Sequence, residues 1–284
     1  MDPNPEPRRT NLHAFLETRG WRGGHAAAHT HVRLRTVDGV QLGATWLPGP
    51  GPSAPAVVLC HGFGARSSKP AYARLADHLA RHAHVLALDL RGHGRSGGHT
   101  TLGDRERLDV AAGVDWVRER GHVTVGLLGV SMGATSVLHA AASGVVVAGV
   151  VVVSGPAEFH DPPQTEAMQR LRRLWDSPVA RTGMRLGLGI RLVHPARWER
   201  PDHPHELATR VDAPVLVVHG DDDHFFPPDD AHRLAAASSG TLWLEPAGFG
   251  HAEDGLTTAF CERLAVAVAE GLGTGRFPER QDVT

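Results

Sequence analysis

The apolar positions of this chain fall into two alternating patterns. Nearly continuous apolar runs, typical of strands buried on both faces of a sheet, lie at 56–60, 84–90, 123–130, 145–154, 213–220 and 241–246. Between these runs, apolar residues recur at spacings of three and four, as in amphipathic helices, at 72–79, 104–119 and 260–272. We also expect a helix rich in small residues at 132–142 and another beginning near Pro228. This alternation predicts a parallel sheet with helices on both faces.

A different pattern precedes the first buried run. The segments "HVRLRTV" and "VQLGATWL" alternate apolar and polar residues on either side of Asp38-Gly39. An Asp-Gly pair between two alternating segments is a strong signal for a two-residue hairpin turn. We therefore expect two antiparallel strands at the start of the sheet.

The alternation of strands and helices is interrupted once. In the insertion 155–212, "EAMQRLRRLW" places Met168, Leu171, Leu174 and Trp175 on one helical stripe, which could roof an acyl pocket or simply pack on the main domain. The stretch "GMRLGLGIRLV" fits either a strand or a helix. We expect an N-terminal extension at 1–28, a core made of 29–154 and 213–276, and a lid or cap insertion at 155–212.

Composition narrows the class of protein. The 284 residues are 41% hydrophobic and 21% charged, which suits a large folded core, and a net charge of −2 does not predict a nucleic-acid partner. Cys60 and Cys261 lie in apolar stretches and are expected to be buried thiols. No signal peptide or apolar run of the roughly 20 residues that a spanning helix needs is visible. We expect a soluble, cytoplasmic protein without stable membrane insertion.

A candidate nucleophile lies where a buried strand meets a helix. Gly129-Val130-Ser131-Met132-Gly133 is a G-x-S-x-G pentapeptide between the apolar run 123–130 and the helical pattern 132–142. A sharp turn from strand to helix needs small residues on either side and projects the serine where backbone N–H groups are free. The pentapeptide alone is a weak signal, but this position favours a catalytic Ser131 over a plain turn.

A serine nucleophile needs a base and an acid, which in sheets of this kind follow it in the order acid, then histidine. "VVHGDDDHFFP" (217–227) ends one later strand, and "PAGFGHAED" (246–254) ends the next and supplies His251. The order fits a Ser-His-Asp triad. By itself the pattern leaves Asp221, Asp222 and Asp223 all open as the acid.

Metal binding is the competing interpretation of these side chains. Neighbouring residues of an extended loop point in different directions, and no metal-ligand spacing such as H-E-x-x-H supports a site at 219–224. His25, His29 and His31 have a spacing that could bind a metal, but in a chain with 20 histidines a surface cluster is favoured. We expect no metal and no cofactor.

Five segments together carry a family resemblance. They are "HGFG" (61–64), "DLRGHGRSGG" (89–98), "GVSMG" (129–133), "HGDDDHFFP" (219–227) and "GFGHAE" (248–253). Over most of 30–273 the chain resembles the α/β-hydrolase superfamily, in its branch of esterases and monoacylglycerol-lipase-like serine hydrolases with a short lid. The resemblance implies a mostly parallel eight-stranded sheet with helices on both faces and a small lid insertion.

The resemblance also assigns residues. In that branch the acid lies three residues after the glycine of the strand-end "HG", with a proline four residues later, which corresponds to Asp223 and Pro227. The residue after the upstream "HG" and the residue after the nucleophile donate the oxyanion N–H groups, which corresponds to Phe63 and Met132. The family commonly has a bulky polar residue, often histidine, where this chain has Val130, and we expect altered packing there.

The same motifs suggest structural roles for other side chains. His61 and His93 lie in family turn motifs, where we expect them to hold the backbone by hydrogen bonds. Asp89 is expected to brace the "RGHG" turn.

The implied activity is hydrolysis of a carboxylic ester with a small to medium acyl group. Met168, Leu171 and Trp175 are candidates for contacting this small-molecule substrate. A thioesterase, peptidase or acyltransferase could use the same triad, and a non-catalytic binding protein on the same fold is the remaining alternative.

Overall fold

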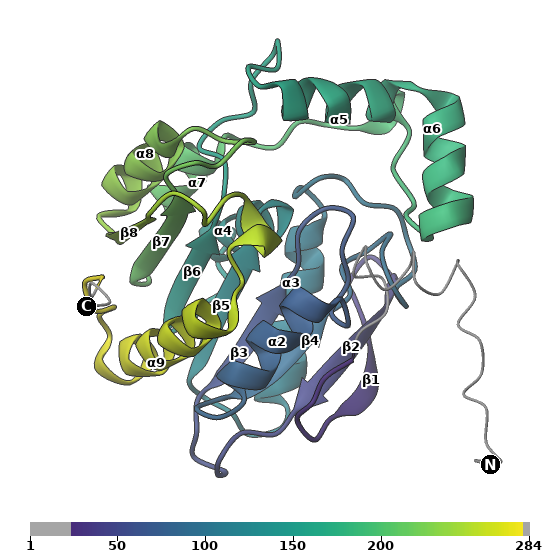
Figure 1. The fold of residues 1–284 in the computed structure, drawn as a ribbon. Coiled ribbons are helices and arrows are strands. Elements are labelled where there is room, and N and C mark those ends of the chain that lie inside the picture. The colour runs from purple at the N-terminus through teal and green to yellow at the C-terminus, as the bar shows by residue number, and fades with distance from the viewer. Residues whose placement is uncertain (1–23, 281–284) are drawn as a thin grey trace, which may run out of the picture.

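A computed structural model describes residues 24–280 and contains one eight-stranded sheet, in the order β1-β2-β4-β3-β5-β6-β7-β8 (Figure 1). Only β2 is antiparallel to its neighbours, β1 and β4. The strands are β1 (Thr30–Arg35), β2 (Gln41–Leu47), β3 (Ala56–Cys60), β4 (His84–Leu88), β5 (Val125–Val130), β6 (Gly149–Val153), β7 (Val215–Gly220) and β8 (Thr241–Glu245). The predicted mostly parallel sheet is confirmed, and the predicted hairpin is β1–β2.

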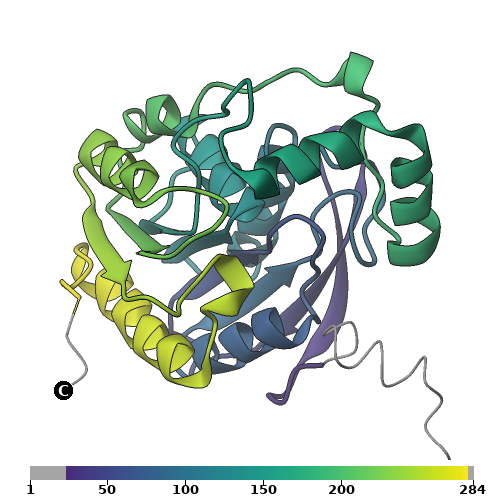
Figure 2. The same ribbon diagram turned by 45° about the horizontal axis from the view of Figure 1, so that its top comes forward.

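Helices cover both faces of this sheet (Figure 2). On one face lie α2 (Pro70–Leu79) and α9 (Thr258–Thr274), whose buried side chains share a cluster with one set of strand residues. On the other face lie α3 (Glu106–Arg118), α4 (Met132–Ala142), α7 (Pro204–Ala208) and α8 (Pro228–Ser238). Because both faces are covered, the central strands read as continuous apolar runs.

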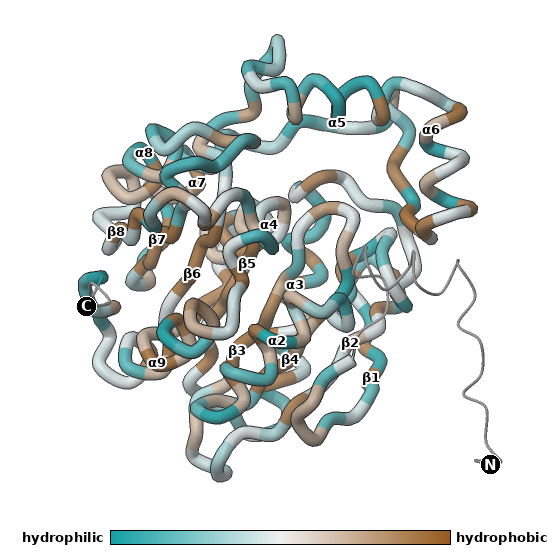
Figure 3. The backbone as a smooth tube through the Cα atoms, viewed as in Figure 1, coloured by the Kyte–Doolittle hydropathy of each residue, from teal (hydrophilic) through white to brown (hydrophobic). Residues whose placement is uncertain are grey.

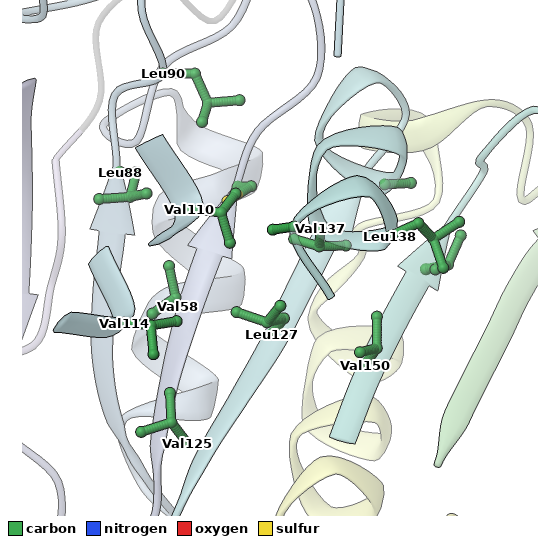
Figure 4. Packing of buried hydrophobic residues seen from close by; sticks show 14 of the residues in the cluster. Val58, Leu88, Leu90, Val110, Val114, Val125, Leu127, Val137, Leu138 and Val150 are labelled. Carbon is green, nitrogen blue, oxygen red and sulfur yellow. The ribbon is translucent and has the colours of Figure 1, made fainter. Parts of the chain in front are cut away.

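Alternate strand residues face opposite clusters. Val58, Leu127 and Val150 pack under α3 and α4 (Figure 4), whereas Val57 and Leu128 face the α2 and α9 side. The two clusters meet only through the sheet, so every central-strand position is buried. Cys60 and Cys261 are free and buried, as predicted, and burial raises the pKa of both thiols.

One predicted strand is shorter than expected. The apolar run 145–154 was predicted to be a strand throughout, but β6 begins at Gly149, where pairing with Gly126 of β5 starts. Residues 145–148 connect α4 to this point, and Val146 is exposed. The connection is apolar without being part of the sheet.

The insertion 155–212 follows β6. It contains the predicted helix as α5 (Glu166–Asp176), then α6 (Pro178–Gly183), a π-helical turn (Met184–Leu188), a 3-10 turn (Pro195–Arg197) and α7. The ambiguous "GMRLGLGIRLV" is helical first and extended afterwards. Figure 3 shows α5 as a largely hydrophilic surface helix.

Backbone hydrogen bonds join the second half of the insertion to the loop after β4. The Arg191 amide donates to Gly92 O at 2.8 Å, and the Val193 amide donates to Thr100 O at 3.0 Å. The Trp198 indole N–H donates to Thr101 O at 2.7 Å. At the other end, Thr165 Oγ1 donates to Phe225 O at 3.1 Å.

The predicted N-terminal extension 1–28 lies mostly outside the described residues, which begin at 24. The Ala26 and Ala27 amides donate to the Asp77 carboxylate on α2. At the other end of the chain, Phe277 packs into the same core cluster as α9. Among the helices of residues 24–280, none combines the length and the apolar character needed to cross a bilayer.

Candidate active site

Ser131 lies at a strained turn between β5 and α4. Its φ and ψ angles are 53° and −115°, outside the regions that non-glycine residues favour. A Cβ on Gly129 would lie 2.2 Å from Gly133 O, and a Cβ on Gly133 would lie 2.3 Å from Cys60 O. Glycine is therefore required on both sides of Ser131, which explains the G-x-S-x-G spacing.

His251 connects Ser131 to Asp223. Its Nε2 lies 3.0 Å from Ser131 Oγ, and its Nδ1 lies 2.8 Å from Asp223 Oδ2. The carboxylate can only accept, so Nδ1 carries the proton and Nε2 is free to accept from the serine hydroxyl. The Asp223 side chain is fully buried, whereas the His251 side chain keeps 11% exposure.

The three neighbouring aspartates occupy different environments. Asp223 Oδ1 accepts from the Phe225 and Phe226 amides at 2.7 and 3.0 Å, which leaves Oδ2 for His251. Asp222 accepts from two glycine amides of the His251 loop, at 2.6 and 2.8 Å, and these bonds lower the pKa of Asp222. Asp221 is exposed. Of these three, only Asp223 is within hydrogen-bonding distance of the His251 ring.

The candidate oxyanion donors flank the serine. Met132 is the first residue of α4, where a helix amide has no intrahelical partner. Phe63 follows Gly62, whose Cα is so close to the serine that an added Cβ would lie 3.3 Å from Ser131 Cβ. In the part of the chain that the structure describes, neither the Phe63 nor the Met132 amide donates a hydrogen bond. Both remain available to a developing oxyanion.

Two buried histidines hold the loop 61–65, called here the oxyanion loop. His61 Nδ1 donates to Gly62 O at 2.8 Å, and its Nε2 accepts from the Leu90 amide at 3.0 Å. His93 Nε2 accepts from the Gly64 amide at 3.2 Å. Burial lowers the pKa of both histidines, to about 3 for His93, so both are neutral supports, as the sequence suggested.

Asp89 anchors the adjoining turn. Its carboxylate accepts from the Ser67 amide at 2.8 Å and from the Arg95 amide at 3.0 Å. Burial opposes ionisation of Asp89, but these hydrogen bonds outweigh it and lower the pKa of the carboxyl. This is the bracing role expected of Asp89.

Comparisons with known proteins agree with this architecture. Residues 55–182 match the family model described as the alpha/beta hydrolase fold. The esterase Pf2001 of Pyrococcus furiosus superimposes with a TM-score of 0.67 at 20% identity, covering 87% of this chain and 93% of that one. The protein has the α/β-hydrolase fold.

Two further esterases have the same fold. RhEst1 from Rhodococcus sp. has a TM-score of 0.63 at 21% identity and covers 86% of this chain and 99% of its own. A thermophilic esterase from Thermogutta terrifontis, in a malate-bound structure, has a TM-score of 0.62 at 22% identity, with coverages of 87% and 99%. No curated protein matches the chain by sequence. The α/β-hydrolase fold that the sequence motifs imply is therefore confirmed.

Several supports of this α/β-hydrolase site carry no sequence signal. Ser154 Oγ accepts from the Ala252 amide at 3.0 Å and so ties the end of β6 to the His251 loop. Tyr72 Oη accepts from the Gly62 amide at 3.0 Å. His219 Nε2 donates to Phe226 O at 3.0 Å behind the acid. The bond between Ser154 and Ala252 joins residues 98 positions apart, which meet only in the tertiary structure.

The candidate substrate contacts lie on α5. Met168 and Leu171 are half-buried. Trp175 is buried and packs edge-on against Trp198, with ring centroids 5.8 Å apart. Val130, where the sequence predicts altered packing, is buried in the core cluster of α2 and α9.

The histidine cluster near the N-terminus is not arranged as a metal centre. The rings of His25, His29 and His31 follow one another with centroids 5.3 and 5.6 Å apart. Within residues 24–280, no group of three or more His, Cys, Asp or Glu side chains is placed to hold a metal ion.

Proposed function

We propose that the protein is a serine hydrolase that cleaves carboxylic esters of small to medium acyl groups through an acyl-enzyme. One observation supports this most directly. Ser131, His251 and Asp223 form a continuous hydrogen-bonded relay, and the candidate oxyanion amides of Phe63 and Met132 have no partners among the described residues. The esterases of the same fold support the reaction class, although fold alone does not set activity.

The proposed mechanism assigns one step to each group. Ser131 Oγ attacks the ester carbonyl while His251 Nε2 takes its proton, and the Phe63 and Met132 amides stabilise the oxyanion. The tetrahedral intermediate collapses, and His251 returns the proton to the leaving alcohol. Water, activated by the same imidazole, then releases the acid. Asp223 keeps the proton of the neutral imidazole on Nδ1 and stabilises the imidazolium that forms.

We further propose that the insertion 155–212 is a lid whose helix α5 contacts the acyl group. Thr165 donates to Phe225 in the loop 221–227, called here the acid loop because it carries Asp223. The start of α5 is therefore at the same edge of the sheet as the relay. Met168, Leu171 and Trp175 are the proposed contacts. A chain-length series measured on Leu171→Ala should then show a shifted preference, whereas simple packing of α5 predicts an unchanged one.

A covalent label and an ester assay test the function together. A fluorophosphonate should label the wild type at Ser131, and Ser131→Ala should lose both the label and about 10⁴-fold or more in kcat on a short para-nitrophenyl ester. Ser143→Ala, an exposed serine after the same helix, is the matched control and should keep both. Retained turnover in Ser131→Ala contradicts the assignment.

A leaving-group series separates the alternatives. An ester hydrolase should prefer oxygen esters. A thioesterase should prefer thioesters, a peptidase should prefer amides, and an acyltransferase should transfer the acyl group to an added acceptor alcohol. Loss of labelling in the wild type would favour a non-catalytic binding protein. The cytoplasmic location expected from the sequence stays a prediction.

A further inference from the structure

A cavity of about 450 Å³ lies beside the oxyanion loop, on the side of strand β1. This volume is within the range of small-molecule sites. Gly64 and Ala65 of the oxyanion loop form one wall, and Leu188 and Ile190 of the insertion form another. The polar lining includes His25, Arg66, Lys69, Asp89 and Arg95.

The charges of this lining favour an anion. Three cationic side chains stand against one carboxylate, Asp89, which is already engaged with the Ser67 amide and with Arg95. Arg95 uses Nε for Asp89 and Nη2 for Thr45, and among the described residues its Nη1 donates to no group. Lys69 is paired with Glu253 through a single contact at 2.5 Å, which leaves further donors on its ammonium.

A buried histidine in the same lining lacks hydrogen bonds. The His25 side chain is only 1% exposed, and neither ring nitrogen has a hydrogen-bond partner among residues 24–280. Its Nδ1 lies 3.6 Å from Asp77 Oδ1, beyond a hydrogen bond. A buried polar group without a partner costs stability, and a ligand in the cavity would supply the missing one.

The N-terminus of α2 adds a third favourable feature. Lys69, which lines the cavity, is the N-cap residue of this ten-residue helix. No side chain caps the helix, and its first turn holds no acidic residue. The helix dipole at such an end favours negative charge.

We propose that this cavity binds an acidic oxygen group, a carboxylate or a phosphate, beside the oxyanion loop. Gly64, which lines the cavity, directly follows Phe63, the proposed oxyanion donor. The favoured substrates are therefore esters that carry such an acidic group. The apolar side chains Leu188 and Ile190 contact the neutral part of the ligand. The substrate claim rests on the proposed ester hydrolysis, whereas the anion site itself does not.

Two measurements on the full-length protein separate these claims. Calorimetric titration with glutarate and with inorganic phosphate tests the cavity without turnover. Kinetics on para-nitrophenyl half-esters of succinate, glutarate and adipate, each compared with the neutral alkanoate ester of equal length, test whether the substrate itself carries the anion. The variants are Arg95→Gln and Lys69→Gln, and the control is Arg170→Gln on α5, which removes an exposed charge that is not part of the lining.

The expected result is saturable anion binding that Arg95→Gln weakens about 10- to 100-fold, the range for loss of a charge-assisted hydrogen bond, while Arg170→Gln leaves it unchanged. For a substrate-borne anion, the ratio of kcat/KM between charged and neutral esters falls by the same factor in Arg95→Gln. Binding of phosphate or glutarate without any preference for charged esters identifies a separate small anion as the ligand.

Some outcomes overturn the proposal. Absence of binding of both anions to the wild type refutes the site, as does binding that neither Arg95→Gln nor Lys69→Gln weakens. Thermal unfolding of each variant is measured first. If Arg95→Gln fails to fold, Lys69→Gln provides the test instead. Anion binding in a protein that hydrolyses no ester would refute the proposed function and leave the site standing.

Discussion

Replacing Asp223 by asparagine tests the proposed triad at a single atom. Asp223 Oδ1 accepts from the Phe225 and Phe226 amides at 2.7 and 3.0 Å, so the asparagine oxygen must take this position. Its NH₂ group then faces His251 Nδ1, where Oδ2 now lies at 2.8 Å. Two donors would meet there unless the imidazole proton moves to Nε2, and a protonated Nε2 cannot accept the proton of Ser131.

This tautomer change should cost turnover but not folding. We expect kcat to fall by about 10⁴-fold, the loss typical of this substitution in a Ser-His-Asp triad, equivalent to about 5 kcal/mol of transition-state stabilisation. Asparagine has nearly the same volume and keeps both amide contacts, so the thermal midpoint should change little. Steady-state kinetics on a short para-nitrophenyl ester and the rate of fluorophosphonate labelling measure the effect.

The two neighbouring aspartates provide matched controls. Asp221→Asn, at an exposed position, should leave kcat within about twofold. Asp222→Asn keeps only one oxygen for the Gly248 and Gly250 amides, so the His251 loop should loosen and activity should fall by at most about tenfold. If Asp222→Asn abolished turnover while Asp223→Asn kept it within that range, the acid would be wrongly assigned.

Three further substitutions test the scaffold. Tyr72→Phe leaves the buried Gly62 amide without its partner and should lower the free energy of unfolding by about 1–3 kcal/mol in urea denaturation; an unchanged midpoint would contradict this bond. Hydrogen bonds from Arg91 lower the pKa of Asp38 to about 2. The stabilisation is therefore present above about pH 4 and lost as the pH falls towards 2, so Asp38→Asn should be less stable by up to about 1 kcal/mol at neutral pH, with a difference that shrinks in acid. Gly133→Ala places a Cβ against a strand carbonyl at 2.3 Å and should cost about 3 kcal/mol or more, or prevent folding, so a stable, active variant would show that the turn can relax.

The sheet could be predicted because both of its faces are covered. Buried strands such as β3 and β5 appear in the sequence as continuous apolar runs, and α9 shows its buried stripe directly. The same criterion extended β6 too far, because the connecting residues before Gly149 are apolar without belonging to the sheet. Apolar content marks the strand but not the residue at which pairing begins.

Short helices left no periodic pattern to detect. Helix α6 has six residues and α7 has five, too few for an apolar stripe to repeat. Each begins at a proline, which fits the first position of a helix but equally fits a turn. Their existence depends on packing within the insertion rather than on local sequence.

Some residues of the candidate site could be predicted from the sequence, and others could not. Ser131 and His251 follow from their positions after the strands β5 and β8, but the choice of Asp223 over its neighbours rests on the family resemblance. The structure shows the physical difference, since the neighbouring Asp222 is engaged with the His251 loop. The bond between Ser154 and the Ala252 amide joins residues 98 positions apart, and no local pattern could have revealed it.

The way the insertion is attached has a consequence for protein engineering. Thr165 fixes one end to the acid loop, and Arg191, Val193 and Trp198 fix the other end to the loop after β4. Between these two anchors, 166–188 exposes large apolar side chains such as Val179 and Leu186, at 82% and 81%. The segment between the anchors is therefore a cassette. We expect helices of other lengths and compositions to be accepted there, with both junctions left as they are.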